Sequence, residues 1–148
     1  HAAGADHTDD MADVWIDLAS VELELHRPHD AVAHYARGVA LLEEIVGVTD
    51  VRLGDPLARE GDAERTLGHT AHAIALLERA LVIETNAKAA PLTLADVQFP
   101  LGQALWVQPA TRARGRAMVE TARAAFGAAG EPYATWVTRI TDWQRTHP

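Results

Sequence analysis

The histidines are the side chains of this sequence best suited to binding a metal ion. His26 and His29, with Asp30 nearby, form one group, and His69 and His72 form a second. Two imidazoles three residues apart on one helical turn can share a face and, with a carboxylate, bind zinc. However, His26 and His69 are expected in turns between helices, and no HExxH motif supplies a catalytic base. The sequence therefore predicts exposed histidines and no dedicated metal site, with only opportunistic binding of a divalent ion left open for His26, His29, His34, His69 and His72.

Nucleophilic catalysis has still less support in the sequence. Ser20 is the only serine, no acid or base is placed to activate it, and there is no cysteine. The absence of cysteine also excludes disulfides and makes a reducing compartment the default expectation. We therefore predict a protein that is not an enzyme and that needs no cofactor.

Charge and hydropathy narrow the classes of partner. The formal net charge is −8, and the acidic side chains are concentrated in the first hundred residues. Nucleic-acid binding depends on basic side chains that neutralise phosphates, so this distribution argues against it. No apolar run approaches the ~18 residues of a membrane span, and the start HAAGADHTDD lacks the features of a signal peptide. We expect a cytoplasmic protein whose partner is neither nucleic acid nor a membrane.

The chain repeats itself after about 42 residues. The stretch RPHDAVAHYARGVALLEE, residues 27–44, returns as HTAHAIALLERALVIETN, residues 69–86. A further shift of about 41 residues carries Asp55 to Asp96 and Gly61 to Gly102. Apolar side chains keep helical spacing within each copy, so each unit is expected to be a pair of helices. Three such units are the minimum usually needed for a solenoid, in which each unit covers its neighbour's apolar face.

Small residues recur at fixed places in these units. They occur at Ala19, Gly61 and Gly102 on the first helix of each unit, and at Ala31 and Ala73 on the second helix. Two antiparallel helices approach closely only where side chains are short. These positions are therefore predicted to be the points where the two helices of each hairpin cross.

The expected architecture is all-α, with seven helices and no strand. Pro28 suits a first helical turn, whereas Gly47 and Gly68 are placed to end helices. Residues 1–8 lack an initiating methionine and are interpreted as a linker remnant of a larger polypeptide. Residues 9–148 form a single domain, with units at about 9–47, 55–86 and 93–127. A last helix at 131–147 is expected to cap the third unit through one apolar stripe: Tyr133, Trp136, Val137, Ile140 and Trp143.

The repeated pattern resembles a known family. The residues Trp15-x-x-Leu18-Ala19, Ala31-x-x-x-Tyr35-x-x-Gly38, and then Gly61, Leu67-Gly68, Ala73, Leu77 and Ala80 resemble tetratricopeptide repeats (TPR) of the roughly 42-residue kind. Three segments are similar in sequence to the C-terminal TPR region of bacterial serine/threonine protein kinases of the myxobacterial type. They are GDPLAREGDAERTLGHTAHAIALLERAL, LADVQFPLGQALW and RARGRAMVETARAAF. Three acidic residues depart from the family pattern, because Glu22, Glu60 and Glu64 stand where large apolar residues are usual.

The resemblance implies a right-handed α-solenoid of three TPR-like hairpins plus the capping helix. It also implies that the first helices line a concave face that binds a peptide or protein segment, without catalysis. Carried onto this sequence, that face comprises Asp13, Ile16, Ser20, Leu23, Asp55, Ala58, Asp62, Arg65, Asp96, Phe99, Gln103 and Trp106. Such a mixed surface suits a segment with a basic residue and an apolar anchor.

Two functions are therefore expected for the chain. The first is a protein-interaction module, a regulatory or partner-recruiting segment of a larger bacterial signalling protein that includes a Ser/Thr kinase. The alternative is a structural self-association element, in which the exposed N-terminal repeat edge stacks on another copy or on missing repeats.

Two groups of side chains allow more than one interpretation. Phe99 and Trp106 either pack as core under the last helix or anchor a ligand on the concave face. Arg112, Arg116 and Arg123 fall near one helical face. That face is expected to be solvated and paired with Glu120, and the alternative is a patch for an anionic partner.

Overall fold

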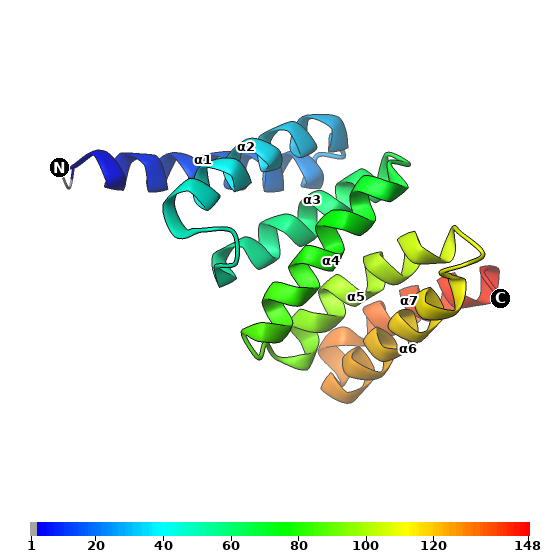
Figure 1. The fold of residues 1–148 in the computed structure, drawn as a ribbon. Coiled ribbons are helices and arrows are strands. Elements are labelled where there is room, and N and C mark those ends of the chain that lie inside the picture. The colour runs from blue at the N-terminus through cyan, green and yellow to red at the C-terminus, as the bar shows by residue number, and fades with distance from the viewer. Residues whose placement is uncertain (1–2) are drawn as a thin grey trace.

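The computed structural model describes the backbone of residues 3–148 and the side chains of residues 9–148, and this part of the chain contains helices and no strand. Seven α-helices follow in order, with a short 3₁₀ helix before the third and another before the seventh (Figure 1). No helix in this range is both long and apolar enough to cross a membrane. The all-α prediction is confirmed. The elements are α1 (Ala3–Glu24), α2 (Pro28–Val46), η1 (Val51–Leu53), α3 (Gly54–Thr66), α4 (Thr70–Asn86), α5 (Pro91–Trp106), α6 (Arg112–Ala129), η2 (Glu131–Tyr133) and α7 (Ala134–Thr146).

The helices form three antiparallel hairpins, α1–α2, α3–α4 and α5–α6, which stack in sequence order (Figure 1). Pro28 and Pro91 stand at the starts of α2 and α5, where a missing N–H costs no helical hydrogen bond. Glycines with positive φ follow α2, α3 and α6: Gly47 (φ 87°), Gly68 (φ 84°) and Gly130 (φ 83°). The turns therefore lie where the sequence placed them.

The start of the first helix differs from the expectation. Helix α1 begins at Ala3, so residues 3–8 are helical rather than a linker remnant, and residues 1 and 2 lie outside the described part. The segment is polar but contains no proline, and its one glycine, Gly4, lies in the first turn of the helix. Nothing in it prevents the helix from extending toward the N-terminus.

The hairpins cross at the predicted small residues. Ala19 and Ala31 are fully buried in the first hairpin. In the second, a Cβ added to Gly61 would lie 3.3 Å from the carbonyl oxygen of Ala73. In the third, a Cβ on Gly102 would lie only 2.7 Å from the carbonyl oxygen of Gly115, a partner that the sequence analysis did not name. Short side chains therefore set the interhelical distance in every hairpin.

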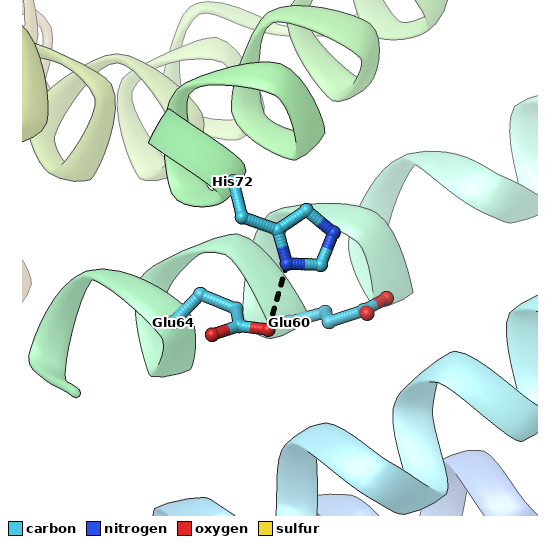
Figure 2. Close-up of side chains that lie close together, drawn as sticks. All are labelled: Glu60, Glu64 and His72. Carbon is cyan, nitrogen blue, oxygen red and sulfur yellow. Dashed lines mark hydrogen bonds and ion pairs between the residues drawn. The ribbon is translucent and has the colours of Figure 1, made fainter. Parts of the chain in front are cut away.

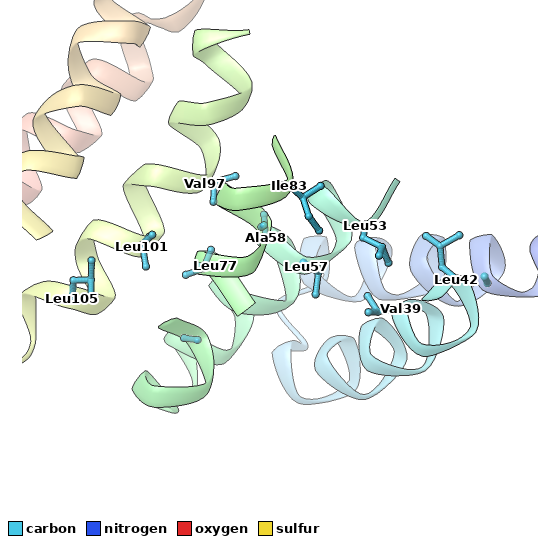
Figure 3. Packing of buried hydrophobic residues seen from close by; sticks show 13 residues of the cluster. Val39, Leu42, Leu53, Leu57, Ala58, Leu77, Ile83, Val97, Leu101 and Leu105 are labelled. Carbon is cyan, nitrogen blue, oxygen red and sulfur yellow. The ribbon is translucent and has the colours of Figure 1, made fainter. Parts of the chain in front are cut away.

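One apolar core runs through the stack (Figure 3). Leu42 of α2, Leu57 of α3, Leu77 of α4 and Leu101 of α5 are all fully or almost fully buried in it. Since side chains from three hairpins share this core, each unit covers the apolar face of the next, as expected for a repeat solenoid.

A second core joins α5, α6 and α7. Ile140 of α7 is fully buried against this cluster, and Trp136 stacks on Phe126 with ring centroids 5.3 Å apart. The last helix therefore covers the third hairpin, as predicted. Ion pairs add links between the hairpins: Arg79 of α4 pairs with Glu43 of α2, and Arg114 of α6 pairs with Glu78 of α4.

Candidate functional site

A groove runs across the first helices of the hairpins and ends at α7. Three adjoining hollows form it. Asp62 lines all three, and four further residues each line two of them: Leu23, Asp96, Trp136 and Arg139. One of these hollows, of about 380 Å³, is bordered by α1, α3, α5 and α7. We call this surface the groove and define it by Leu23, Asp55, Ala58, Arg59, Asp62, Asp96, Phe99, Gln103, Tyr133, Trp136 and Arg139.

Most of the residues expected on the concave face line this groove. First helices of successive hairpins stand side by side, so residues one repeat apart, such as Asp55 and Asp96, come to face the same hollow. The structure brings together Leu23, Asp55, Ala58, Asp62, Asp96, Phe99 and Gln103.

Three expected residues of α1 lie elsewhere. Asp13 faces Arg52, 3.7 Å away, outside the groove. Ile16 packs beneath Gly38 of α2. Ser20 lies within hydrogen-bonding distance of the hydroxyl of buried Tyr35, at 2.8 Å. Ile16 and Ser20 therefore contact α2, the partner helix of α1, whereas Asp13 faces η1.

The two remaining residues also do not line the groove. Arg65 binds Asp62 of the same helix at 2.8 Å, so it acts on the groove through that carboxylate. Trp106, at the end of α5, lies under the guanidinium of Arg112 at 4.5 Å and meets Trp143 edge-on at 6.0 Å. Phe99 also meets Trp143 edge-on, at 6.4 Å. For both aromatics, packing under the last helix is the observed arrangement.

Helix α7 contributes groove residues that the sequence analysis missed. Trp136 and Arg139 line the hollows next to α5, and the guanidinium of Arg139 lies 5.0 Å from the Trp136 ring centroid. A further shift of about 40 residues from Asp96 and Phe99 reaches Trp136 and Arg139. Extending the repeat by one more unit would therefore have predicted both residues on the groove.

The groove is lined by three carboxylates, Asp55, Asp62 and Asp96, and by two guanidiniums, Arg59 and Arg139. Asp55 binds Arg59 at 2.9 Å, whereas Asp96 forms no ion pair with any described side chain. Desolvation raises the pKa of Asp96, the negative charge of Asp55 raises it further, and Arg59 opposes the shift. An incoming cation would favour the ionised form of Asp96 and bind more strongly to it.

Three of the histidines that were predicted to be exposed contact buried glutamates, and two of them, His69 and His72, are exposed as predicted. His34 Nδ1 lies 2.7 Å from Glu22, whose carboxylate is buried between α1 and α2. Glu64 of α3 lies 2.5 Å from His69 Nδ1 and 2.8 Å from His72 Nδ1. Two of the three acidic departures from the repeat pattern, Glu22 and Glu64, are therefore buried groups in contact with imidazoles, which spacing along one helix could not reveal.

On α6, Arg116 is exposed and Arg123 pairs with Glu120, as the solvated interpretation expects, whereas the guanidinium of Arg112 packs over the Trp106 ring. Arg123 binds Glu120 through two hydrogen bonds, of 2.7 and 3.1 Å. Hydrogen bonds from Arg123 and from Gln144 lower the pKa of Glu120 to about 2. Arg116 is exposed on this helix, away from the groove.

Comparison with known proteins decides the family. The tetratricopeptide repeat family model matches residues 10–83, which is half of the chain. This chain belongs to the tetratricopeptide repeat family. TPR domains generally mediate protein–protein interaction and are not catalytic modules.

A solved structure agrees with this assignment. The N-terminal domain of stress-induced protein-1 (STI-1) from C. elegans superposes with a TM-score of 0.60 at 13% identity. The match covers 90% of this TPR chain and 97% of that domain, which shows a shared fold. The comparison with curated proteins gave no significant match.

Proposed function

We propose that the groove binds a protein segment, extended or helical, that carries a basic residue and an apolar anchor. The observation that carries the proposal is the position of Asp96. This carboxylate has no ion-pair partner among the described side chains and lines the same hollow as Trp136. A cationic side chain of the ligand would complete the pairing, and an apolar neighbour would fill the space beside the indole.

The two contacts have different roles in binding. Charge complementarity speeds encounter and orients the segment, whereas the buried apolar anchor supplies most of the affinity. Asp55 and Asp62 add negative potential along the floor, and their pairing with Arg59 and Arg65 keeps it moderate. The groove therefore favours one basic residue beside an anchor over a strongly basic tract.

A peptide library with one fixed Lys or Arg beside varied apolar residues tests the proposal. Asp96→Asn, which keeps the size of the side chain, should weaken the best peptide at least about tenfold. Trp136→Ala should weaken it similarly, with the thermal midpoint measured to confirm folding. Arg116→Glu is the control, since Arg116 is exposed on α6 away from the groove. Binding that falls only in Arg116→Glu would place the site on the arginine face and contradict the groove.

We also propose which kind of larger protein contains this module. The sequence of residues 54–126 resembles the TPR region of bacterial serine/threonine protein kinases, which supports the proposal that the chain is a regulatory or recruiting segment of a cytoplasmic bacterial signalling protein with a Ser/Thr kinase domain. The coding sequence around this segment tests that part directly. A parent polypeptide without a kinase domain would remove the kinase setting and leave the groove proposal intact.

A specific observation favours self-association as a second function. An apolar stripe with alternating spacings of three and four residues lies exposed along α1 and the residue that follows it: Met11, Val14, Leu18, Val21 and Leu25. One repeat later the corresponding positions are buried against the preceding hairpin, as Leu53 and Ala63 show. This spacing is that of a two-helix coiled-coil seam, so we propose a second copy of the chain as the occupant.

Sedimentation across concentration tests the second function. Leu18→Lys should abolish any dimer, whereas Arg145→Ala on α7 should not. Asp10, Asp17 and Glu24 recur every seven residues beside the stripe, so added salt should strengthen the association by screening their repulsion. A chain that stays monomeric at all concentrations and salt levels would refute self-association.

A further inference from the structure

A second candidate site lies on the opposite side of α3 from the groove. Glu60 and Glu64 are one helical turn apart on α3, and His72 stands in the first turn of α4 (Figure 2). One ligand atom from each of these three side chains lies within 4.8 Å of the other two. Movement of side chains alone, without movement of the helices, could bring the three atoms onto one ion.

Glu60 is the unusual member of the cluster. Its side chain is almost entirely buried, with 3% exposure, yet it makes no hydrogen bond or ion pair with any side chain of residues 9–148. Burial raises the pKa of Glu60 to about 7, because the ionised form loses its hydration. A largely desolvated carboxyl that lacks an ion-pair partner costs free energy unless a proton or a cation neutralises it.

The charges around Glu60 favour a cation over other ligands. Glu64 and Glu43 add negative charge from α3 and α2, and Arg79 and His72 of α4 oppose it. Arg79 is engaged by Glu43 and by the carbonyl oxygen of Val48 at 2.8 Å. The local excess is therefore acidic, and the strongest base nearby is occupied elsewhere.

We propose that Glu60, Glu64 and His72 bind a divalent late transition metal, with Zn²⁺ as the best fit. Two carboxylate oxygens and one imidazole nitrogen form the kind of three-ligand set that zinc accepts, with water in the fourth position. His72 is exposed, so the ion has a route in from solvent.

His69 takes a supporting role in this site. Its Nδ1 lies 2.5 Å from Oε2 of Glu64, while His72 is bonded to Oε1. A hydrogen bond of this kind orients a ligating carboxylate and fixes which oxygen faces the ion. His69 is therefore a positioning residue, and its loss should weaken binding less than the loss of a ligand.

The first hairpin supplies a natural comparison. It also contains a buried glutamate held by an imidazole, Glu22 with His34 at 2.7 Å. The position one repeat before Glu60 is Leu18, which offers no ligand atom. The second carboxylate is thus specific to the second hairpin, and so is the proposed site.

An ion at this site would bridge α3 and α4. Helix α3 presents Asp55, Ala58 and Asp62 to the groove on its other side. Fixing α3 to α4 would therefore stiffen the groove floor without adding any contact to a ligand. The metal proposal stands independently of the peptide proposal, since neither needs the other's residues.

Calorimetric titration of the full, chelator-treated chain with Zn²⁺ tests the proposal. We expect one saturable site in the unaltered chain and a thermal midpoint that rises with Zn²⁺ concentration. Glu60→Gln and His72→Ala should each weaken the affinity at least about tenfold and remove that rise. His34→Gln is the matched control and should bind as the unaltered chain does. Four-coordinate Co²⁺ absorption should be present in the chain and lost in Glu60→Gln.

Glu60→Gln is the most informative variant for the metal site, because glutamine keeps the shape of the side chain and removes the buried charge. Saturable binding that survives in Glu60→Gln would overturn the site. Titration without any saturable binding, or loss of binding in His34→Gln to the same extent, would overturn it as well.

Discussion

At the residue scale, the buried glutamates show how a polar side chain can occupy a repeat's core position. Glu22 and Glu64 stand where an apolar residue would pack, and imidazoles of the following helix bind them. Such contacts replace the hydration that burial removes. Glu60 lacks this compensation, so its carboxyl responds to pH instead.

The pH dependence of stability should therefore reveal Glu60. In metal-free protein its folded-state pKa of about 7 lies above the ordinary value of 4.5, so the unfolded chain gives up this proton first. The contribution of Glu60 to the free energy of unfolding is complete at low pH and is lost as the pH rises from 4.5 to 7. Glu60→Gln should be more stable than the unaltered chain above pH 7 by ~1–3 kcal/mol, and the gain should vanish toward pH 4.5.

Urea denaturation at several pH values measures this difference. Glu120 provides a control of opposite sign, because Arg123 and Gln144 lower its pKa to about 2. Its contribution is present above the ordinary pKa and lost as the pH falls toward 2, so Glu120→Gln should not be stabilised at neutral pH. A Glu60→Gln variant with the same pH profile as the unaltered chain would mean that Glu60 is solvated or partnered.

At the element scale, the helices and their hairpin pairing could be predicted because both are local. Proline and glycine mark the ends of helices, and small residues mark the crossings. The histidine contacts could not be predicted, because they depend on how far one helix is rotated against the next. A rotation of about 100°, the angle between successive helical residues, would carry an imidazole out of reach of Glu64.

The closest crossing should be the least tolerant of added atoms. A Cβ on Gly115 would lie 2.6 Å from the carbonyl oxygen of Gly102 and 2.9 Å from the backbone nitrogen of Trp106. Both obstacles are backbone, so Gly115→Ala should destabilise the protein by ~1–3 kcal/mol. Gly127→Ala on the same helix is the control, since nothing lies within 4 Å of its added Cβ. It should be neutral or stabilising by up to ~1 kcal/mol, as measured by thermal or urea melting.

The second hairpin allows a related test of the repeat register. Ala73 is fully buried where α3 and α4 cross, so Ala73→Leu should destabilise by ~1–3 kcal/mol through overpacking. Ala31→Leu should do the same in the first hairpin, because Ala31 occupies the equivalent buried position. Ala75→Leu, at an exposed position of α4, provides the comparison. Equal midpoints for all three variants would contradict the close crossing.

At the scale of the whole molecule, stacking determines which predicted residues become a site. The repeat register brought seven of the expected residues into the groove, since successive first helices lie side by side. It failed at both ends of the stack. Residues of α1 serve their own hairpin, and α7 takes the place of a fourth first helix, so that Trp136 and Arg139 replace Trp106 in the groove. A periodic pattern cannot specify its own ends, because an end lacks the neighbour that defines the pattern.

Helix α7 should therefore be needed for both stability and binding. It buries Ile140 against the third hairpin and stacks Trp136 on Phe126, so removing residues 131–148 would expose Phe126 and Val119 to water. We expect the shortened chain to melt far below the intact one or to aggregate, and Ile140→Ala alone to cost ~2–5 kcal/mol in urea denaturation. Arg145→Ala, on the exposed side of α7, should leave the midpoint unchanged. Because Ile140 lies beneath the helix and does not line the groove, Ile140→Ala should keep its peptide affinity while it remains folded, whereas Trp136→Ala should lose it. Unchanged melting after the deletion would refute the capping role, and equal peptide affinity in Trp136→Ala would remove α7 from the groove.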